Sequence, residues 1–253
     1  MVAVGALPYA QARMQARLGR RPPEAVWQAI EHARAAESLI ELVRDTTLHA
    51  PLSQLGSGRS IHSIEAGMRG VWRASVAELA AWMPPEWEGA LLWCGVVPEL
   101  PWLRHWASGG ASAEWTRADP RWRSLLEFSK ERGPALPPGH EFAPLAPALA
   151  CPARLASAWS LEFKRRLPAH DAASLAPLAR LIEQYFAHVL QVGAPEAPRL
   201  RQRFEMRLLG HFRRHSTEAA AAFAWLGLTA LDLDRLRGEL VLRLALPARS
   251  FAS

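Results

Sequence analysis

The stretch that decides the fold class is SIHSIEAGMRGVWRASVAELAAWM, residues 60–83. Its apolar side chains recur every three or four residues, over about six helical turns. They are Ile61, Ile64, Met68, Val71, Trp72, Val76, Leu79, Trp82 and Met83. This spacing places them on one face of an α-helix. Pro84 and Pro85 end the pattern, because proline lacks the N–H group that a helix interior needs.

The same spacing returns in residues 171–191 and 198–215, which predicts two further amphipathic helices. Residues 24–46 follow Pro22 and Pro23 and form another helical segment, because a proline in the first turn loses no hydrogen bond. We expect this segment to break near residues 36–38.

One stretch competes with the helical interpretation. Residues 239–246, ELVLRLAL, alternate in part, as an edge strand would. A helix is favoured, because Leu233, Leu236, Leu240 and Leu244 form a single stripe at helical spacing. We therefore predict an all-α fold, a bundle of amphipathic helices.

A proline-rich stretch marks the best boundary in the chain. Residues 132–147, RGPALPPGHEFAPLAP, show little periodicity and contain two glycines. We predict a helical subdomain over residues 1–131, a connector over 132–150 and a second helical subdomain over 151–253.

The basic residues are almost all arginine. The net charge is +6, and Lys130 and Lys164 are the only lysines among 30 basic residues. A coding bias explains this composition more readily than nucleic-acid binding does. The basic pairs fall near predicted helix ends, where cations complement the helix dipole, and acidic residues lie between them. The absence of a long basic block argues against a nucleic-acid partner.

Composition also indicates the cellular compartment of the protein. Cys94 and Cys151 are the only cysteines, which is too few for a disulfide framework and favours a reducing compartment. The amino terminus has no positively charged segment before an apolar core, so we expect no signal peptide. The most apolar run, residues 219–233, is shorter than the roughly 20 residues that a membrane-spanning helix needs. We expect a cytoplasmic protein, with membrane contact only through partners.

The sequence contains no motif typical of a catalytic or cofactor site. A nucleophile elbow and a P-loop are both absent. His211 and His215 lie four residues apart and could reach one metal ion, but no third ligand is indicated. Asp232 and Asp234 point in different directions on a helix, so they make no acid–base pair. We expect no catalysis, no cofactor, no metal ion and no small-molecule substrate.

Eleven tryptophans are many for 253 residues, and seven of them fall between residues 72 and 115. A stacking surface for a ligand or base is one interpretation. Packing in the core is favoured, because most of them share a helical spacing with other apolar residues.

Three segments together resemble one protein family. The first helix, YAQARMQARLGRR, contains an aromatic-x-x-x-Arg-x-x-x-Arg pattern at Tyr9, Arg13 and Arg17. The segment after it ends in a Leu-x-x-Asp-Thr turn at Leu42, Asp45 and Thr46. The next segment contains an Ile-Glu pair followed by Pro-Glu, at Ile64, Glu65, Pro85 and Glu86. Near the end, an aromatic segment precedes two acidic residues and an arginine, at Asp232, Asp234 and Arg237. In this order, the three segments resemble the C/d subunit family of V-type and A-type rotary ATPases.

The resemblance implies an all-helical, funnel-like protein of two or three similar subdomains. It implies a non-catalytic subunit of an ion-transporting complex, which joins the central shaft to the membrane rotor ring. Tyr9, Arg13, Arg17, Glu65, Asp232, Asp234 and Arg237 would then be structural or interface residues. Two alternatives stay open: a helical adaptor of the same ancestry in another membrane-associated complex, and an arginine-rich nucleic-acid-binding protein. An enzyme whose site is assembled from scattered residues is a further alternative, although no residue nominates that site.

The first helix suggests a physical role for its small and basic residues. We expect Ala10, Ala12 and Ala16 to allow close helix packing. We expect Arg13 and Arg17, one turn apart, to bind carboxylates or helix carbonyls of a neighbouring element, because guanidinium groups suit such pairing.

Overall fold

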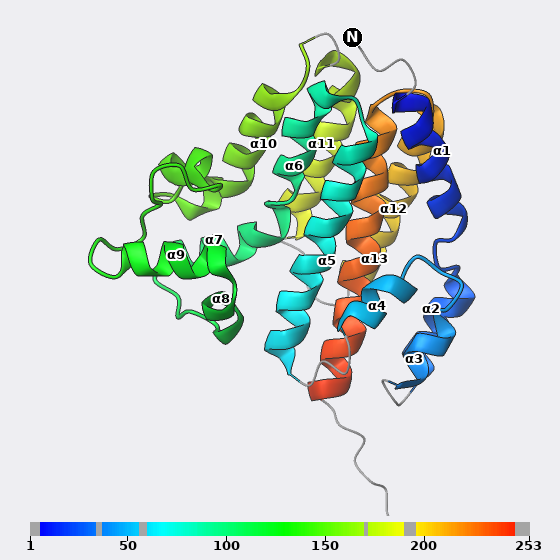
Figure 1. The fold of residues 1–253 in the computed structure, drawn as a ribbon, viewed down its shortest axis with the longest axis horizontal. Helices are drawn as coiled ribbons and strands as arrows, with labels where there is room; N and C mark the ends of the chain where they lie inside the picture. The colour runs from blue at the N-terminus through cyan, green and yellow to red at the C-terminus, as the bar shows by residue number, and fades with distance from the viewer. Residues whose placement is uncertain (1–5, 34–36, 56–59, 170–171, 190–195, 246–253) are drawn as a thin grey trace, which may run out of the picture.

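The computed structural model describes residues 6–33, 37–55, 60–169, 172–189 and 196–245 (Figure 1). In this part of the chain every regular element is a helix, so the predicted all-α fold is confirmed. The four longest helices are α5 (Ile61–Trp82), α11 (Ala172–Val189), α12 (Ala197–Arg214) and α13 (Ala220–Ala245). The stretch at 239–246 therefore lies almost wholly within a helix, as favoured over an edge strand.

Shorter helices complete the fold. The α-helices are α1 (Ala6–Gly19), α2 (Glu24–His32), α3 (Glu37–Leu42), α4 (His49–Leu55), α6 (Glu88–Cys94), α7 (Leu100–Ala107), α8 (Glu114–Ala118), α9 (Pro120–Ser129) and α10 (Leu155–Arg166). The 3₁₀ helices are η1 (Pro85–Trp87), η2 (Val97–Glu99), η3 (Ala143–Ala148) and η4 (Pro152–Arg154). The predicted break in the second segment falls between α2 and α3; residues 34–36 there lie outside the described part.

Helices α5 and α13 run side by side through the middle of the molecule (Figure 1). Helices α11 and α12 pack against α13, while α6 and α10 lie on one flank and α1 on the other. Helices α7, α8 and α9 extend outward beside α10, and α2, α3 and α4 gather near the far end of α13. No helix in these described ranges is both long enough and apolar enough to cross a bilayer.

Helix α5 begins and ends where local chemistry requires. Ser60 is its N-cap: the Ser60 hydroxyl accepts from Ser63 N at 3.1 Å, and Ser63 Oγ accepts from Ser60 N at 3.2 Å. This reciprocal pair satisfies backbone donors that the first turn leaves free. At the other end, Met83 is extended, as the residue before a proline prefers.

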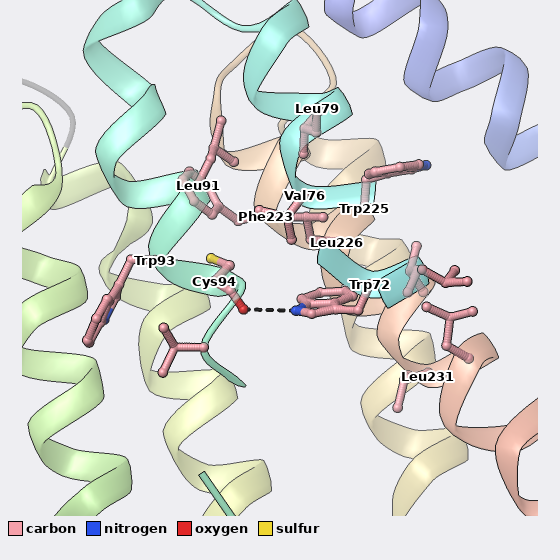
Figure 2. Close-up of a cluster of buried hydrophobic side chains, with 14 of the residues drawn as sticks. Trp72, Val76, Leu79, Leu91, Trp93, Cys94, Phe223, Trp225, Leu226 and Leu231 are labelled. Carbon is pink, nitrogen blue, oxygen red and sulfur yellow. Dashed lines mark hydrogen bonds between the residues drawn. The ribbon is translucent and has the colours of Figure 1, made fainter. Parts of the chain in front are cut away.

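Tryptophan side chains fill the core, as the packing interpretation predicted. All of them except the partly buried Trp102 are at least 92% buried. Trp72 on α5 donates from Nε1 to the carbonyl oxygen of Cys94 on α6, at 3.0 Å (Figure 2). Trp93 and Trp159 each donate to the other's carbonyl oxygen, which ties α6 to α10. The indole N–H groups thereby keep their hydrogen bonds inside the apolar core.

The two predicted subdomains share one continuous core. Helix α13, from the later segment, packs against α5 and α1 from the earlier one. The predicted connector also contributes to the core, because Phe142 and Leu145 are completely buried. The division at 132–150, the similar subdomains and the funnel shape remain predictions.

The packing expected for the first helix is only partly correct. Ala10 is buried, but Ala12 and Ala16 are exposed, and Met14 is the second buried residue of α1. The reason is geometric: positions 10 and 14 are one turn apart and face α13 and α5, while 12 and 16 lie on the opposite side.

Candidate functional site

A crevice of about 390 Å³ opens between α1, α4, α5 and α13, and we call it the Arg21 crevice. The end of α1 and the turn after it supply three guanidinium groups, and α5 and α13 supply two carboxylates. Hydroxyl groups come from the segment before α4, from α5 and from α13. The polar lining residues are Arg17, Arg20, Arg21, Thr46, Thr47, His49, Gln54, Ser75, Glu78, Thr229 and Asp232. Two of the predicted site residues, Arg17 and Asp232, therefore lie in one crevice.

The deepest charge of the crevice is Asp232. Its carboxylate accepts two hydrogen bonds from Arg21, at 2.6 and 2.7 Å, and Arg21 also lies 2.8 Å from Glu205 on α12. Burial raises the pKa of the Asp232 carboxyl, although the paired Arg21 opposes that rise. Burial lowers the pKa of Arg21, but Asp232 and Glu205 outweigh it and raise the pKa above its ordinary value. The pair joins the turn after α1 to α13.

The arginines of the first helix bind a carboxylate of a neighbouring helix, as expected, and that helix is α5. Arg17 Nη2 lies 2.5 Å from Glu78 Oε1, and Arg13 Nη2 lies 3.8 Å from the same oxygen. Both guanidinium groups also lie over the Trp82 ring, at 4.8 and 4.9 Å from its centroid. Tyr9 is half exposed, and its ring lies 5.7 Å from the Arg13 guanidinium carbon. The spaced arginines thus attach α1 to one carboxylate and one indole.

Glu65 and Arg237 come together from distant parts of the sequence. Arg237 on α13 donates to Glu65 Oε1, and Arg69 donates to Glu65 Oε2 at 2.5 Å. Asp234, at 3.4 Å from Arg237, is largely exposed, so the two aspartates of α13 do point apart as predicted. His62, on the same helix as Glu65, lies 3.7 Å from Glu114. Glu65 instead turns toward two arginines.

Glu99 is the buried residue that sequence reasoning missed. Its completely buried carboxylate accepts from Arg69 at 3.2 Å, from Arg121 at 2.7 Å and from the Trp122 indole at 2.9 Å. The Arg69 guanidinium also lies 3.8 Å from the centroid of the Trp115 ring. A lone acid inside the apolar run CGVVPELPWL was the available signal, since a buried carboxylate requires partners.

Arg235 forms a second connection that the motifs did not indicate. It lies 3.0 Å from Glu24 and 2.7 Å from Glu31, with its guanidinium carbon 4.6 Å from the centroid of the Trp27 ring. These contacts attach α13 to α2. Burial lowers the pKa of Arg235, but the two glutamates outweigh burial and raise it above its ordinary value.

The carboxylates described above share one kind of partner. The carboxylates of Glu65, Glu78, Glu99 and Asp232 each accept from arginine, which keeps its proton and cannot act as a base. His211 and His215 stack at 5.8 Å between ring centroids, and His215 Nδ1 lies 3.1 Å from Glu218. Across the described ranges, no group of three or more His, Cys, Asp or Glu side chains is placed to hold a metal ion.

The two thiols also differ in what they can do. Burial raises the pKa of Cys94 to about 12, so this thiol stays protonated and unreactive near neutral pH. Cys151 is exposed.

Comparisons with protein-family models, curated proteins and solved structures find no match to this chain. The resemblance to the rotary ATPase subunits therefore depends on the three motifs alone. What the geometry adds is the position of each motif residue in the fold.

Proposed function

We propose that the protein is a non-catalytic coupling subunit of a V/A-type rotary ATPase, a socket that joins the central shaft to the membrane rotor ring. The observation that carries this proposal is that the charged motif residues form ion pairs with other parts of the fold. Arg13, Arg17, Glu65 and Arg237 each pair with a residue on another helix, and Asp232 pairs with Arg21 in the turn after α1.

These pairs connect the two ends of the chain. Arg21 binds Asp232 and Arg237 binds Glu65, so α13 is attached both to the segment after α1 and to α5. Arg235 adds α2 to the same set. A subunit that transmits torque needs its helices held in one body, and ion pairs among partly buried side chains, together with a dense tryptophan core, favour a single packed arrangement.

The same observation argues against the enzyme alternative. A catalytic carboxylate must be free to take or give a proton in contact with substrate. Glu78 and Asp232, the carboxylates of the Arg21 crevice, are both paired with guanidinium groups. The proposed location follows from the proposed partners: the protein lies in the cytoplasm and reaches the membrane only through its complex.

The test is copurification from the source cells. The tagged chain is purified from membranes in a mild detergent, and the bound proteins are identified by mass spectrometry. We expect the central-shaft and rotor-ring subunits in stoichiometric amounts. The proposal fails if the complete rotary complex assembles without this chain, or if the chain copurifies with membrane proteins of another complex, as the adaptor alternative requires.

A further inference from the structure

The outer face of α12 carries a line of arginines. Arg199, Arg203 and Arg207 are four residues apart, Arg213 and Arg214 follow about two turns after Arg207, and all five are exposed. Phe204, Leu208 and Phe212 lie on the opposite face and are buried. We call the five arginines, with the exposed Met206 and Gly210 among them, the α12 stripe. From Arg199 to Arg214 it is about 22 Å long, at the helical rise of about 1.5 Å per residue.

Within the described part of the chain, the charges of the stripe are not neutralised. No described carboxylate forms an ion pair with any of the five arginines; Arg207 donates to the Gln184 amide oxygen at 3.5 Å. Elsewhere Arg21, Arg69 and Arg237 are all paired with carboxylates. The positive potential extends to the neighbouring histidine: burial lowers the pKa of His211, and the charges of His215, Arg214 and Arg207 lower it further.

Two uncharged residues in the stripe suit contact with another helix. Met206 is 68% exposed, although its side chain is apolar and adaptable in contacts. One turn later, a Cβ on Gly210 would meet no atom of this chain. The fold therefore does not need a glycine there, and glycine is unfavourable in a helix interior relative to alanine. Its missing side chain leaves room for a partner backbone to approach closely.

We propose that the α12 stripe binds an acidic amphipathic helix of a second protein. Carboxylates on that helix, spaced by three or four residues, would pair with the line of arginines. An apolar residue would cover Met206, and the helices would cross at Gly210. The argument is one of charge complementarity along a helical repeat, because two helices with matching spacing can form several ion pairs at once.

Other occupants fit the same surface less well. A single-stranded nucleic acid would use aromatic side chains for stacking, and the stripe has none. A membrane-surface helix inserts its apolar face into lipid, whereas the apolar face of α12 is already buried in the core. A second copy of this chain is a poor match, since no described helix exposes more than two carboxylates. The inference does not depend on the rotary ATPase proposal.

The test uses the full chain and two labelled acidic peptides of about 20 residues, long enough to span the stripe. Both contain the same glutamates, leucine and alanines. One places the glutamates along a single helical face around the leucine, and the other distributes them around the helix. Binding is measured by fluorescence anisotropy at low and moderate salt. A DNA duplex and vesicles of phosphatidylglycerol and phosphatidylcholine serve as the other anionic probes.

We expect the one-faced peptide to bind about tenfold more tightly than the distributed one, a difference of about 1.4 kcal/mol. Arg203→Glu with Arg207→Glu should weaken its binding by about tenfold or more, because it creates like-charge contacts. Arg104→Glu with Arg154→Glu, which makes the same charge change on α7 and η4, should leave binding unchanged. Gly210→Gln should weaken binding several-fold, and Gly238→Gln, at an equally open position on α13, should not.

Circular dichroism of each variant verifies that the chain stays folded. Equal binding of the two peptides would overturn the proposal, because the stripe would then respond to charge alone. Tighter binding of the duplex or of the vesicles, lost in Arg203→Glu with Arg207→Glu, would overturn it in favour of a nucleic acid or a membrane surface.

Discussion

Arg21 donates two hydrogen bonds to Asp232, a residue 211 positions further along the chain, at 2.6 and 2.7 Å. Asp232 is 5% exposed, so its carboxylate has little access to water. This single contact connects the segment after the first helix to the last helix.

Removing Arg21 leaves a buried charge without its partner. We expect Arg21→Ala to lower the free energy of unfolding by about 3 kcal/mol, the typical cost of breaking a buried pair. Urea denaturation followed by circular dichroism measures this change. Asp234→Ala is the matched control, because the Asp234 side chain is 57% exposed, and it should change stability by less than about 0.5 kcal/mol. Equal effects of the two variants would contradict the importance of the buried pair.

Arg13 stabilises the fold through Trp82 and Glu78. A partly exposed cation–π contact contributes about 0.5–1 kcal/mol, so Arg13→Ala should lower Tm by about 1–4 °C in a chain of this size. Arg104→Ala, at an exposed arginine on α7, is the control and should leave Tm unchanged. A thermal melt in which Arg13→Ala also leaves Tm unchanged would show that the predicted role is wrong.

Glu99 organises the charges beneath α7, α8 and α9. Glu99→Leu removes one acceptor from each of Arg69 and Arg121 and the acceptor of the buried Trp122 indole, and we expect it to cost about 3–5 kcal/mol. Glu99→Gln keeps one acceptor oxygen and should cost less. The near-ultraviolet circular dichroism of the tryptophans reports local loosening. If Glu99→Leu proves the more stable of the two, the buried carboxylate contributes nothing to stability.

The stability of the protein should depend on pH through Glu65. Burial raises the pKa of the Glu65 carboxyl, but Arg69 and Arg237 outweigh burial and lower it below its ordinary value of 4.5. The stabilisation is therefore complete above pH 4.5 and is lost as the pH falls through the lower pKa of the folded state. Burial raises the pKa of Asp232, so its titration changes the stability with pH in the opposite direction.

Glu65→Gln removes this titration. The variant should be less stable than the parent chain at pH 7, and its stability should fall less steeply below pH 4.5. Urea midpoints measured from pH 7 down to pH 3 provide the comparison. Parallel pH profiles for the two proteins would exclude Glu65 as a source of the acid dependence.

Two glycines of α13 should respond oppositely to alanine. A Cβ on Gly227 would lie 2.9 Å from Leu208 Cδ1, and Leu208 is completely buried on α12. Gly227→Ala should therefore destabilise the protein by about 1–3 kcal/mol through overpacking. A Cβ on Gly238 meets nothing, so Gly238→Ala should stabilise it by up to about 1 kcal/mol. Differential scanning calorimetry compares the stability of the two variants. A stabilising effect of Gly227→Ala would contradict the close approach of α12 and α13.

Helices that repeat their apolar spacing over several turns were predictable, and those between residues 88 and 129 were not. Helices α5, α12 and α13 contain enough turns for the apolar spacing to be evident from residues such as Ile64, Phe204 and Leu236. The helices between residues 88 and 129 are at most 10 residues long, and two of the longer ones begin with a proline in the first turn, so no helical period can develop. In the candidate site, the sequence predicted that Arg13 and Arg17 bind a carboxylate. It did not predict that this carboxylate belongs to Glu78, since nothing in the sequence selects one acid among many.

Three features follow from the sequence alone: the helical class, the burial of the tryptophans and the divergent directions of Asp232 and Asp234. All three depend on periodicity within a single helix. Only the tertiary structure decided that Asp232 meets Arg21, that Arg237 meets Glu65 and that Glu99 is buried among arginines. Such partners lie up to 211 residues apart, and their meeting depends on how whole helices pack. Local spacing contains no information about that packing, whereas the position of every side chain in the core depends on it.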